Sequence, residues 1–228
     1  MLKMSNQFDR TQKLIGDEGL QRLFASKVLV IGVGGVGGYA VEMLARCGVG
    51  TIGIMDSDDV EESNLNRQII ALSSTLGMSK VDAFSKRIAD INSNCNVIAI
   101  KERFSANNCG ILDGDWDYVI DAIDSFEDKV NLICLAKEKG LNVISAMGAG
   151  NRIVNCDFEI CDIYKTSYDA LAKKLRKALR EKGVKSLDVC YTKEPTISTT
   201  GGVGSISYVP PMCGIKIAGH VIEQLLKK

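Results

Sequence analysis

The chain has 228 residues, 46% of them hydrophobic and 25% charged, which is enough for one large domain with a substantial core. Its 28 basic and 28 acidic residues cancel, so overall basicity is excluded and any contact with nucleic acid must come from a local patch. No run of 18 apolar residues suggests a membrane span, and residues 1–7 lack the apolar core of a secretory signal, which predicts a cytoplasmic protein.

The first predicted strand, residues 27–33, is apolar and β-prone, and it enters a glycine-rich turn before a helical pattern over residues 37–47. The turn contains Gly32, Gly34, Gly35 and Gly37. Glycine is needed because a Cβ would block the tight turn and the approach of backbone N–H groups to phosphate oxygens. The N-terminus of the helix adds positive partial charge. The segment therefore predicts a phosphate-binding turn.

The second predicted strand, residues 51–56, ends on an acid. Asp56 follows Gly37 by 19 positions, where a carboxylate can accept hydrogen bonds from the hydroxyls of a ribose. An NAD-dependent oxidoreductase uses the same arrangement. The strand and its acid therefore predict a nucleotide without deciding which one.

The loop after this acid is dense in polar residues, and it narrows the choice of nucleotide. Arg67 can stabilise phosphate charge through a bidentate fork, and Asn64 and Gln68 can hydrogen-bond ribose or phosphate. Lys80 opens the next predicted helix, residues 79–91, where it would place a point charge near phosphates. An NAD enzyme has no need of such a loop, so these residues favour a triphosphate.

Strand and helix patterns keep alternating up to residue 146. Further strands are expected at residues 96–101, 117–121 and 141–146, with helices at 105–112 and 126–139. This alternation predicts an α/β fold, namely a Rossmann-like doubly wound, mostly parallel sheet with right-handed crossovers. Ligands of such sheets bind beyond the carboxyl ends of the strands, where the glycine turn, Asp56 and residues 121–124 all fall.

Two acids follow the fourth predicted strand, and we expect different roles for them. Asp124 suits the Mg²⁺ that accompanies ATP, because this ion prefers carboxylate and phosphate oxygens. Asp121 is expected to cap or orient the loop instead.

The pattern changes after residue 150. The expected elements are one or two strands over 152–163, a basic helix over 168–182, strands over 187–209 broken near 199–204, and a closing helix over 211–226 after two prolines. We interpret them as a C-terminal α/β extension that completes a single domain, residues 1–228. Residues 1–150 would form its nucleotide-binding part and residues 151–228 the part for substrate binding and dimerisation.

Eight cysteines are present, and none forms a Cys-x-x-Cys pair. The closest two, Cys156 and Cys161, have four residues between them, whereas structural zinc sites usually present tighter pairs. We therefore expect no zinc site, and reduced cytosolic thiols. His220 is the only histidine, which excludes mechanisms that need two, and its helical setting favours a structural role.

These motifs together resemble those of the ubiquitin-activating, ThiF/MoeB-type superfamily. The match runs collinearly from residue 8 to about residue 150 through the four glycines, Asp56, Asn64, Arg67, Gln68, Lys80 and Asp124. The resemblance implies an enzyme that adenylates a carboxylate with ATP and Mg²⁺. It implies that Asp56 holds the ribose and that Asp124 serves the metal. It also implies phosphate contacts from Asn64, Arg67, Gln68 and Lys80.

Arg10, in the sequence Phe8-Asp9-Arg10-Thr11, matches an N-terminal arginine that in relatives reaches the phosphates of the partner subunit. The resemblance thus implies a homodimer in which Arg10 joins Arg67, Lys80 and Asp124 in catalysis. Whether a sulfur-acceptor or redox partner protein also docks is left open.

Within the superfamily, the chain is most similar to the tRNA threonylcarbamoyladenosine dehydratases. The opening at residues 8–16, the pattern from Asp121 to Lys129 and the missing Cys-x-x-Cys pairs all favour them, and the similarity extends to residues 187–194. The resemblance implies that the threonine carboxylate of the modified adenosine attacks ATP. An atom of the substrate's own urea would then close a ring and release AMP.

The basic helix fits a tRNA substrate. Residues 165–185 hold eight Lys or Arg and two acids, a local charge of +6 that tRNA phosphates could use. The candidate contacts are Lys173, Lys174, Arg176, Lys177 and Arg180. The alternative is a solvated amphipathic helix, because Lys and Arg are common on exposed helix faces.

Other functions remain open from the sequence. The chain could activate the C-terminal glycine of a ubiquitin-like sulfur-carrier protein, act as an NAD-dependent oxidoreductase, or serve as a non-catalytic nucleotide-binding scaffold. Cys190 and Cys213 are candidate acyl acceptors, as in relatives that pass a thioester.

Overall fold

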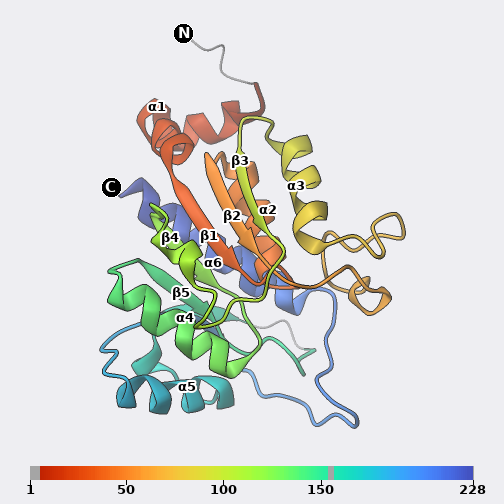
Figure 1. Ribbon diagram of the computed structural model, residues 1–228, viewed down its shortest axis with the longest axis vertical. Coiled ribbons are helices and arrows are strands. Elements are labelled where there is room, and N and C mark those ends of the chain that lie inside the picture. The colour runs from red at the N-terminus through yellow and green to blue at the C-terminus, as the bar shows by residue number, and fades with distance from the viewer. Residues whose placement is uncertain (1–5, 154–156, 228) are drawn as a thin grey trace.

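The computed structural model describes residues 6–153 and 157–227 (Figure 1). Residues 154–156, which include Cys156 and part of the strand segment expected over 152–163, lie outside the described residues.

The described residues contain one seven-stranded sheet, which confirms the predicted α/β fold. Its strands are β1 (Lys27–Ile31), β2 (Thr51–Met55), β3 (Asn96–Ile100), β4 (Tyr118–Asp121), β5 (Val143–Ala146), β6 (Phe158–Asp162) and β7 (Asp188–Thr192). The spatial order is β3-β2-β1-β4-β5-β7-β6, and only the pairing of β6 with β7 is antiparallel. The C-terminal extension therefore continues the same sheet.

Helices cover both faces of the sheet (Figure 1). They are α1 (Asp9–Ala25), α2 (Gly37–Cys47), α3 (Lys80–Ile91), α4 (Phe126–Glu138), α5 (Ala170–Glu181) and α6 (Val209–Leu226). Side chains alternate along β1, so Val28 and Val30 pack with α2, α3 and α6, whereas Leu29 and Ile31 pack with α4 and α5. None of the helices described is long and apolar enough to cross a membrane.

Two expected elements differ from the structure, and local chemistry explains both. Residues 105–112 form no α-helix, only a 3₁₀ turn over Gly110–Asp113, because the Asn and Gly residues there favour turns. The segment 187–209 holds a single strand, β7, and residues 193–208 are irregular. Gly201 and Gly202 in that segment adopt φ of +93° and +117°, which a strand does not use.

The first and last helices also differ from the helices that the sequence predicted. The sequence reasoning missed α1, which is mostly polar and is kinked at Gly16, where φ is +72°. Helix α6 begins at Val209, so its two prolines lie inside the first turn, where no backbone N–H is required.

Helix α6 crosses close to the glycine turn. A Cβ added to Gly214 would lie 2.2 Å from the backbone oxygen of Val36, so only glycine allows this approach. Pro210, one turn earlier, packs against Gly35. The start of α2 is thus held between β1 and α6.

Candidate functional site

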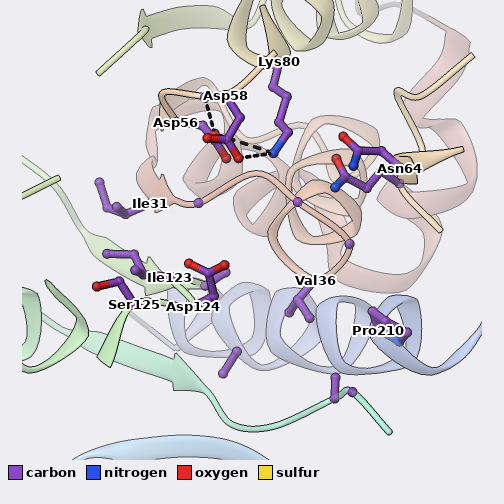
Figure 2. Close-up of a pocket in the computed structure, with 18 of the residues that line it drawn as sticks. Ile31, Val36, Asp56, Asp58, Asn64, Lys80, Ile123, Asp124, Ser125 and Pro210 are labelled. Atoms are coloured by element: carbon purple, nitrogen blue, oxygen red, sulfur yellow. Dashed lines mark hydrogen bonds and ion pairs between the residues drawn. The ribbon is translucent and has the colours of Figure 1, made fainter. Parts of the chain in front are cut away.

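A cavity of about 820 Å³ opens at the carboxyl ends of β1, β2, β4 and β5 (Figure 2). Most of the predicted site residues line it, namely Gly32, Gly34, Gly35, Asp56, Asn64, Arg67, Gln68, Lys80 and Asp124. The structure therefore brings together segments that are separated by up to 92 positions in the sequence.

The glycine turn forms one wall of the cavity, and its tightness explains its composition. Gly32 has φ of +84°, and a Cβ there would lie 2.7 Å from the backbone oxygen of Ala122. A Cβ on Gly37, which lies behind the wall, would lie 1.9 Å from the backbone oxygen of Gly32. Side chains are thus excluded at Gly32 and Gly37, and the backbone of Gly34 and Gly35, just before α2, lines the cavity.

Asp56 joins the end of β2 to the glycine turn. Its carboxylate accepts hydrogen bonds from the backbone N–H of Val33 at 2.8 Å and of Asp58 at 2.9 Å. These bonds fix the carboxylate at the cavity wall, where each oxygen keeps lone pairs for a ligand hydroxyl.

Lys80 lies in the same wall, and its ammonium sits between two carboxylates (Figure 2). Nζ is 2.7 Å from Asp58 Oδ2 and 3.8 Å from Asp56 Oδ1. The hydrogen bond from Lys80 lowers the pKa of Asp58 below its usual value. Sequence reasoning missed Asp58, although its position two residues after Asp56 was an available signal.

The two amides of the polar loop are placed differently. Asn64 is committed to the loop itself, because Oδ1 accepts from the backbone N–H of Glu61 at 3.2 Å and Nδ2 donates to Ser63 Oγ at 3.1 Å. Gln68 is also buried, but its Oε1 has no partner among the described residues, and the same holds for Ser205 Oγ. Both oxygens belong to residues that line the cavity, so each could accept a hydrogen bond from a ligand or water there.

Arg67 presents a charge that no carboxylate in the described structure neutralises. Its Nη1 donates to the backbone oxygen of Ser63 at 2.8 Å and to Asn66 Oδ1 at 2.9 Å. Because the guanidinium has five N–H donors, it keeps donors for an anionic ligand.

Asp124 projects into the cavity from the loop after β4 (Figure 2). Its side chain is exposed and forms no ion pair within the described part of the chain. Arg103, which sequence reasoning missed, lines the cavity nearby and pairs with Asp128 at 2.6 Å and Ser125 Oγ at 3.2 Å. A single arginine in a β3–β4 connection carries no sequence signal that could have identified it.

Two predicted groups lie outside the cavity. Arg10 is exposed on α1 and does not reach the cavity of its own chain. On α5, Lys173, Lys174, Lys177 and Arg180 are exposed, while Arg176 is half-buried and donates to the backbone oxygen of Thr166 at 2.9 Å. Leu171 of α5 lines the cavity, so the first turn of this basic helix lies beside it.

The alternative nucleophiles are poorly placed. Cys190 and Cys213 are fully buried, and neither lines the cavity. The hydrogen bond between the two thiols, together with burial, raises the pKa of Cys213 well above its usual value. His220 lies 3.5 Å from Asp188 Oδ2, away from the cavity. The geometry gives no support to an acyl-enzyme on either thiol.

The arrangement suits a nucleoside triphosphate. Asp56 can accept ribose hydroxyls, the glycine turn and Arg67 can face phosphate oxygens, and Asp124 offers a carboxylate to a hard cation.

Three comparisons show which known proteins the whole chain is similar to. The model of the ThiF family matches residues 8–228. The tRNA threonylcarbamoyladenosine dehydratase of Bacillus subtilis (strain 168) is 41% identical, over 98% of this chain and 96% of that protein. The structure of the Escherichia coli tRNA N6-threonylcarbamoyladenosine dehydratase in complex with ATP superposes with a TM-score of 0.91 at 32% identity, covering 97% of this chain and 94% of that one. The adenylyltransferase and sulfurtransferase UBA4 of Vanderwaltozyma polyspora is 41% identical over 60% of this chain and 31% of that protein.

Proposed function

The chain belongs to the ThiF family, and we propose that it is an ATP-dependent dehydratase of threonylcarbamoyladenosine in tRNA. The observation that carries this function is the identity with a dehydratase over almost the full length of both chains. The activation of a sulfur-carrier protein is less well supported, because the activating relative aligns with little more than half of this chain.

The reaction takes place in two steps. The threonine carboxylate of the substrate attacks the α-phosphorus of ATP, and pyrophosphate leaves with the bonding electrons. An atom of the substrate's own urea then attacks the carbonyl of the acyl-adenylate, loses its proton and expels AMP. The net change in the nucleoside is the loss of one water. No enzyme nucleophile is required, because the attacking atom is held close within the same molecule.

The chain supplies positioning and charge. We propose that Asp56 accepts the ribose hydroxyls, while the glycine turn and the start of α2 donate to phosphate oxygens. Arg67 would stabilise the charge that develops on the α-phosphate, and Gln68 would donate an amide N–H nearby. Lys80 could bind a phosphate oxygen if its ammonium shifted part of its hydrogen bonding from Asp58 to the phosphate.

Asp124 fits a role as the ligand of Mg²⁺, since its carboxylate is exposed in the cavity and unpaired among the described residues. The ion, when bound, would neutralise phosphate charge and favour the departure of pyrophosphate. Asn64 would hold the loop that carries Arg67 rather than touch the nucleotide itself.

We further propose that the active form is a homodimer in which Arg10 reaches the partner's nucleotide, and that residues 151–228 bind the tRNA and the partner subunit. The exposure of Arg10 on α1 supports the first part, and the basic helix α5, whose first turn lies beside the cavity, supports the second. Because the substrate is tRNA, we place the reaction in the cytoplasm.

The function is tested by incubating the protein with ATP, Mg²⁺ and total tRNA. We expect stoichiometric release of AMP and pyrophosphate, and mass analysis of the digested nucleosides should show that the modified adenosine has lost one water. Control tRNA that lacks the threonylcarbamoyl group should release neither product. AMP release that requires a carrier protein ending in Gly-Gly would instead favour the activating function.

The role of α5 is tested by charge reversal. Changing Lys173, Lys174 and Lys177 to Glu should weaken tRNA binding. It should also make the slope of log affinity against log salt shallower by about 2 to 3, because about one counterion fewer is released on binding for each phosphate contact that is lost. A matched control reverses three scattered exposed lysines, Lys13, Lys86 and Lys216, and should leave the slope almost unchanged. Equal slopes in both variants would assign α5 to an ordinary solvated face.

A further inference from the structure

A buried polar network centred on Lys129, Asp121 and Ser145 lies next to the cavity, and none of these three residues lines it. Lys129 of α4 has a side chain only 1% exposed, and its Nζ donates to Asp121 Oδ2 at 2.6 Å. The same Nζ donates to Ser145 Oγ at 3.2 Å and to the backbone oxygen of Ala146 at 3.2 Å. All three donors of the ammonium are therefore used.

Asp121 completes the network. Its Oδ1 accepts from the backbone N–H of Ile123 at 3.0 Å, and its Oδ2 also accepts from the hydroxyl of Ser145 at 2.5 Å. The carboxylate is fully buried, so each of its bonds is shielded from water.

The network joins two walls of the cavity. Asp121 holds the loop 122–125, which carries Asp124, and Ala146 opens the segment 146–150, which forms the facing wall. Lys129 contacts both, so one side chain fixes the distance between them. Ala122 of the first loop packs in turn against Gly32 and Gly37 of the phosphate turn.

Stability alone does not account for such a pair. Two buried charges lose their hydration, and an apolar pair of similar volume is often as stable or more stable. Lys129 does not line the cavity and so cannot touch the nucleotide directly. What the pair provides is a fixed geometry, since its bonds are directional and fully satisfied.

We propose that Lys129 and Asp121 are positioning residues for adenylation, which hold Asp124 and the facing segment 146–150 at the separation that the reacting phosphate requires. This role rests on the proposed function. It adds the requirement that the two cavity segments be held together by hydrogen bonds to a residue of α4 that does not contact the substrate.

The test separates positioning from folding through a double variant. Lys129→Met alone should lower both the melting temperature and kcat, because Asp121 is left buried and unpaired. Asp121→Asn/Lys129→Met removes both charges and retains an acceptor for the N–H of Ile123, so most of the melting temperature should return. We expect its kcat to stay about 100-fold below wild type with the KM for ATP changed less than about threefold, as for a small misplacement of reacting groups.

Leu132→Ala is the matched control, since Leu132 is fully buried on the same helix and does not line the cavity. It should lower the melting temperature and leave kcat near wild type. Recovery of kcat together with stability in the double variant would overturn the proposal. If the double variant does not fold, Ser145→Ala provides the test. We expect it to lower kcat about tenfold, and an unchanged kcat would contradict the proposal.

Hydrogen exchange keeps this test separate from the proposed function. The amides of residues 122–125 and 146–150 should lose protection in the double variant and keep it in Leu132→Ala, whatever reaction the protein catalyses. Unchanged protection would overturn the positioning role, whereas absence of AMP release in the wild type would overturn only the function.

Discussion

Arg67→Ala is expected to lower kcat about 1,000-fold, equivalent to ~4 kcal/mol of transition-state stabilisation, while leaving the melting temperature close to wild type. Among the described residues the side chain donates hydrogen bonds only to Ser63 and Asn66, within its own loop, so its loss breaks no contact between distant segments. Its charge has no carboxylate partner in the described structure, which leaves it available to the α-phosphate. Pyrophosphate release under single-turnover conditions measures the effect.

Two further variants sharpen this result. Arg67→Lys keeps the charge but loses the planar fork, so it should recover only part of the activity. Lys86→Ala removes one positive charge from an exposed position on α3, away from the cavity, and should leave kcat unchanged. Nearly full turnover in Arg67→Ala would show that the phosphates are stabilised by the glycine turn without this arginine.

Asp124→Ala is expected to reduce turnover by a similar factor, between about 100-fold and 1,000-fold, because the proposed metal would lose its protein ligand. Asp124→Asn keeps the shape of the side chain but removes its charge. It should reduce turnover almost as much as Asp124→Ala if the charge holds the metal. In both variants the Mg²⁺ concentration for half-maximal rate should rise. Chelation of the metal should stop pyrophosphate release in the wild type.

The control for Asp124 lies three residues away. Glu127 is exposed in the first turn of α4 and does not line the cavity, so Glu127→Ala removes the same charge from the same surface. Its Mg²⁺ dependence should match that of the wild type. An unshifted dependence in Asp124→Asn would mean that the metal is held by phosphates and water alone.

The sequence predicted the strands of the nucleotide-binding half well because their signals are local. The apolar runs at 27–33 and 51–56 and the glycines between them are read within a few residues, and β1 and β2 end within two residues of their predicted limits. The placement of Asp56 and Asp124 at one cavity followed from the rule that ligands bind at the carboxyl ends of parallel strands.

The contacts that the sequence could not predict are those between distant segments. The pairing of Lys129 with Ser145 and Ala146, and of Asp58 with Lys80, depends on side-chain directions that are set only after the sheet has formed. The same holds for β7, which enters between β5 and β6 although β6 precedes it in the chain. Helix α1 was not predicted because its mostly polar sequence shows little helical periodicity of apolar residues.

The close packing of α6 on the phosphate turn has a consequence for the making of the protein. Residues 32–37 leave the ribosome well before Pro210 and Gly214, which pack against Gly35 and Val36. A nascent chain should therefore be unable to hold ATP firmly until it has been translated past Gly214. ATP would then stabilise finished molecules and leave truncated ones to proteolysis.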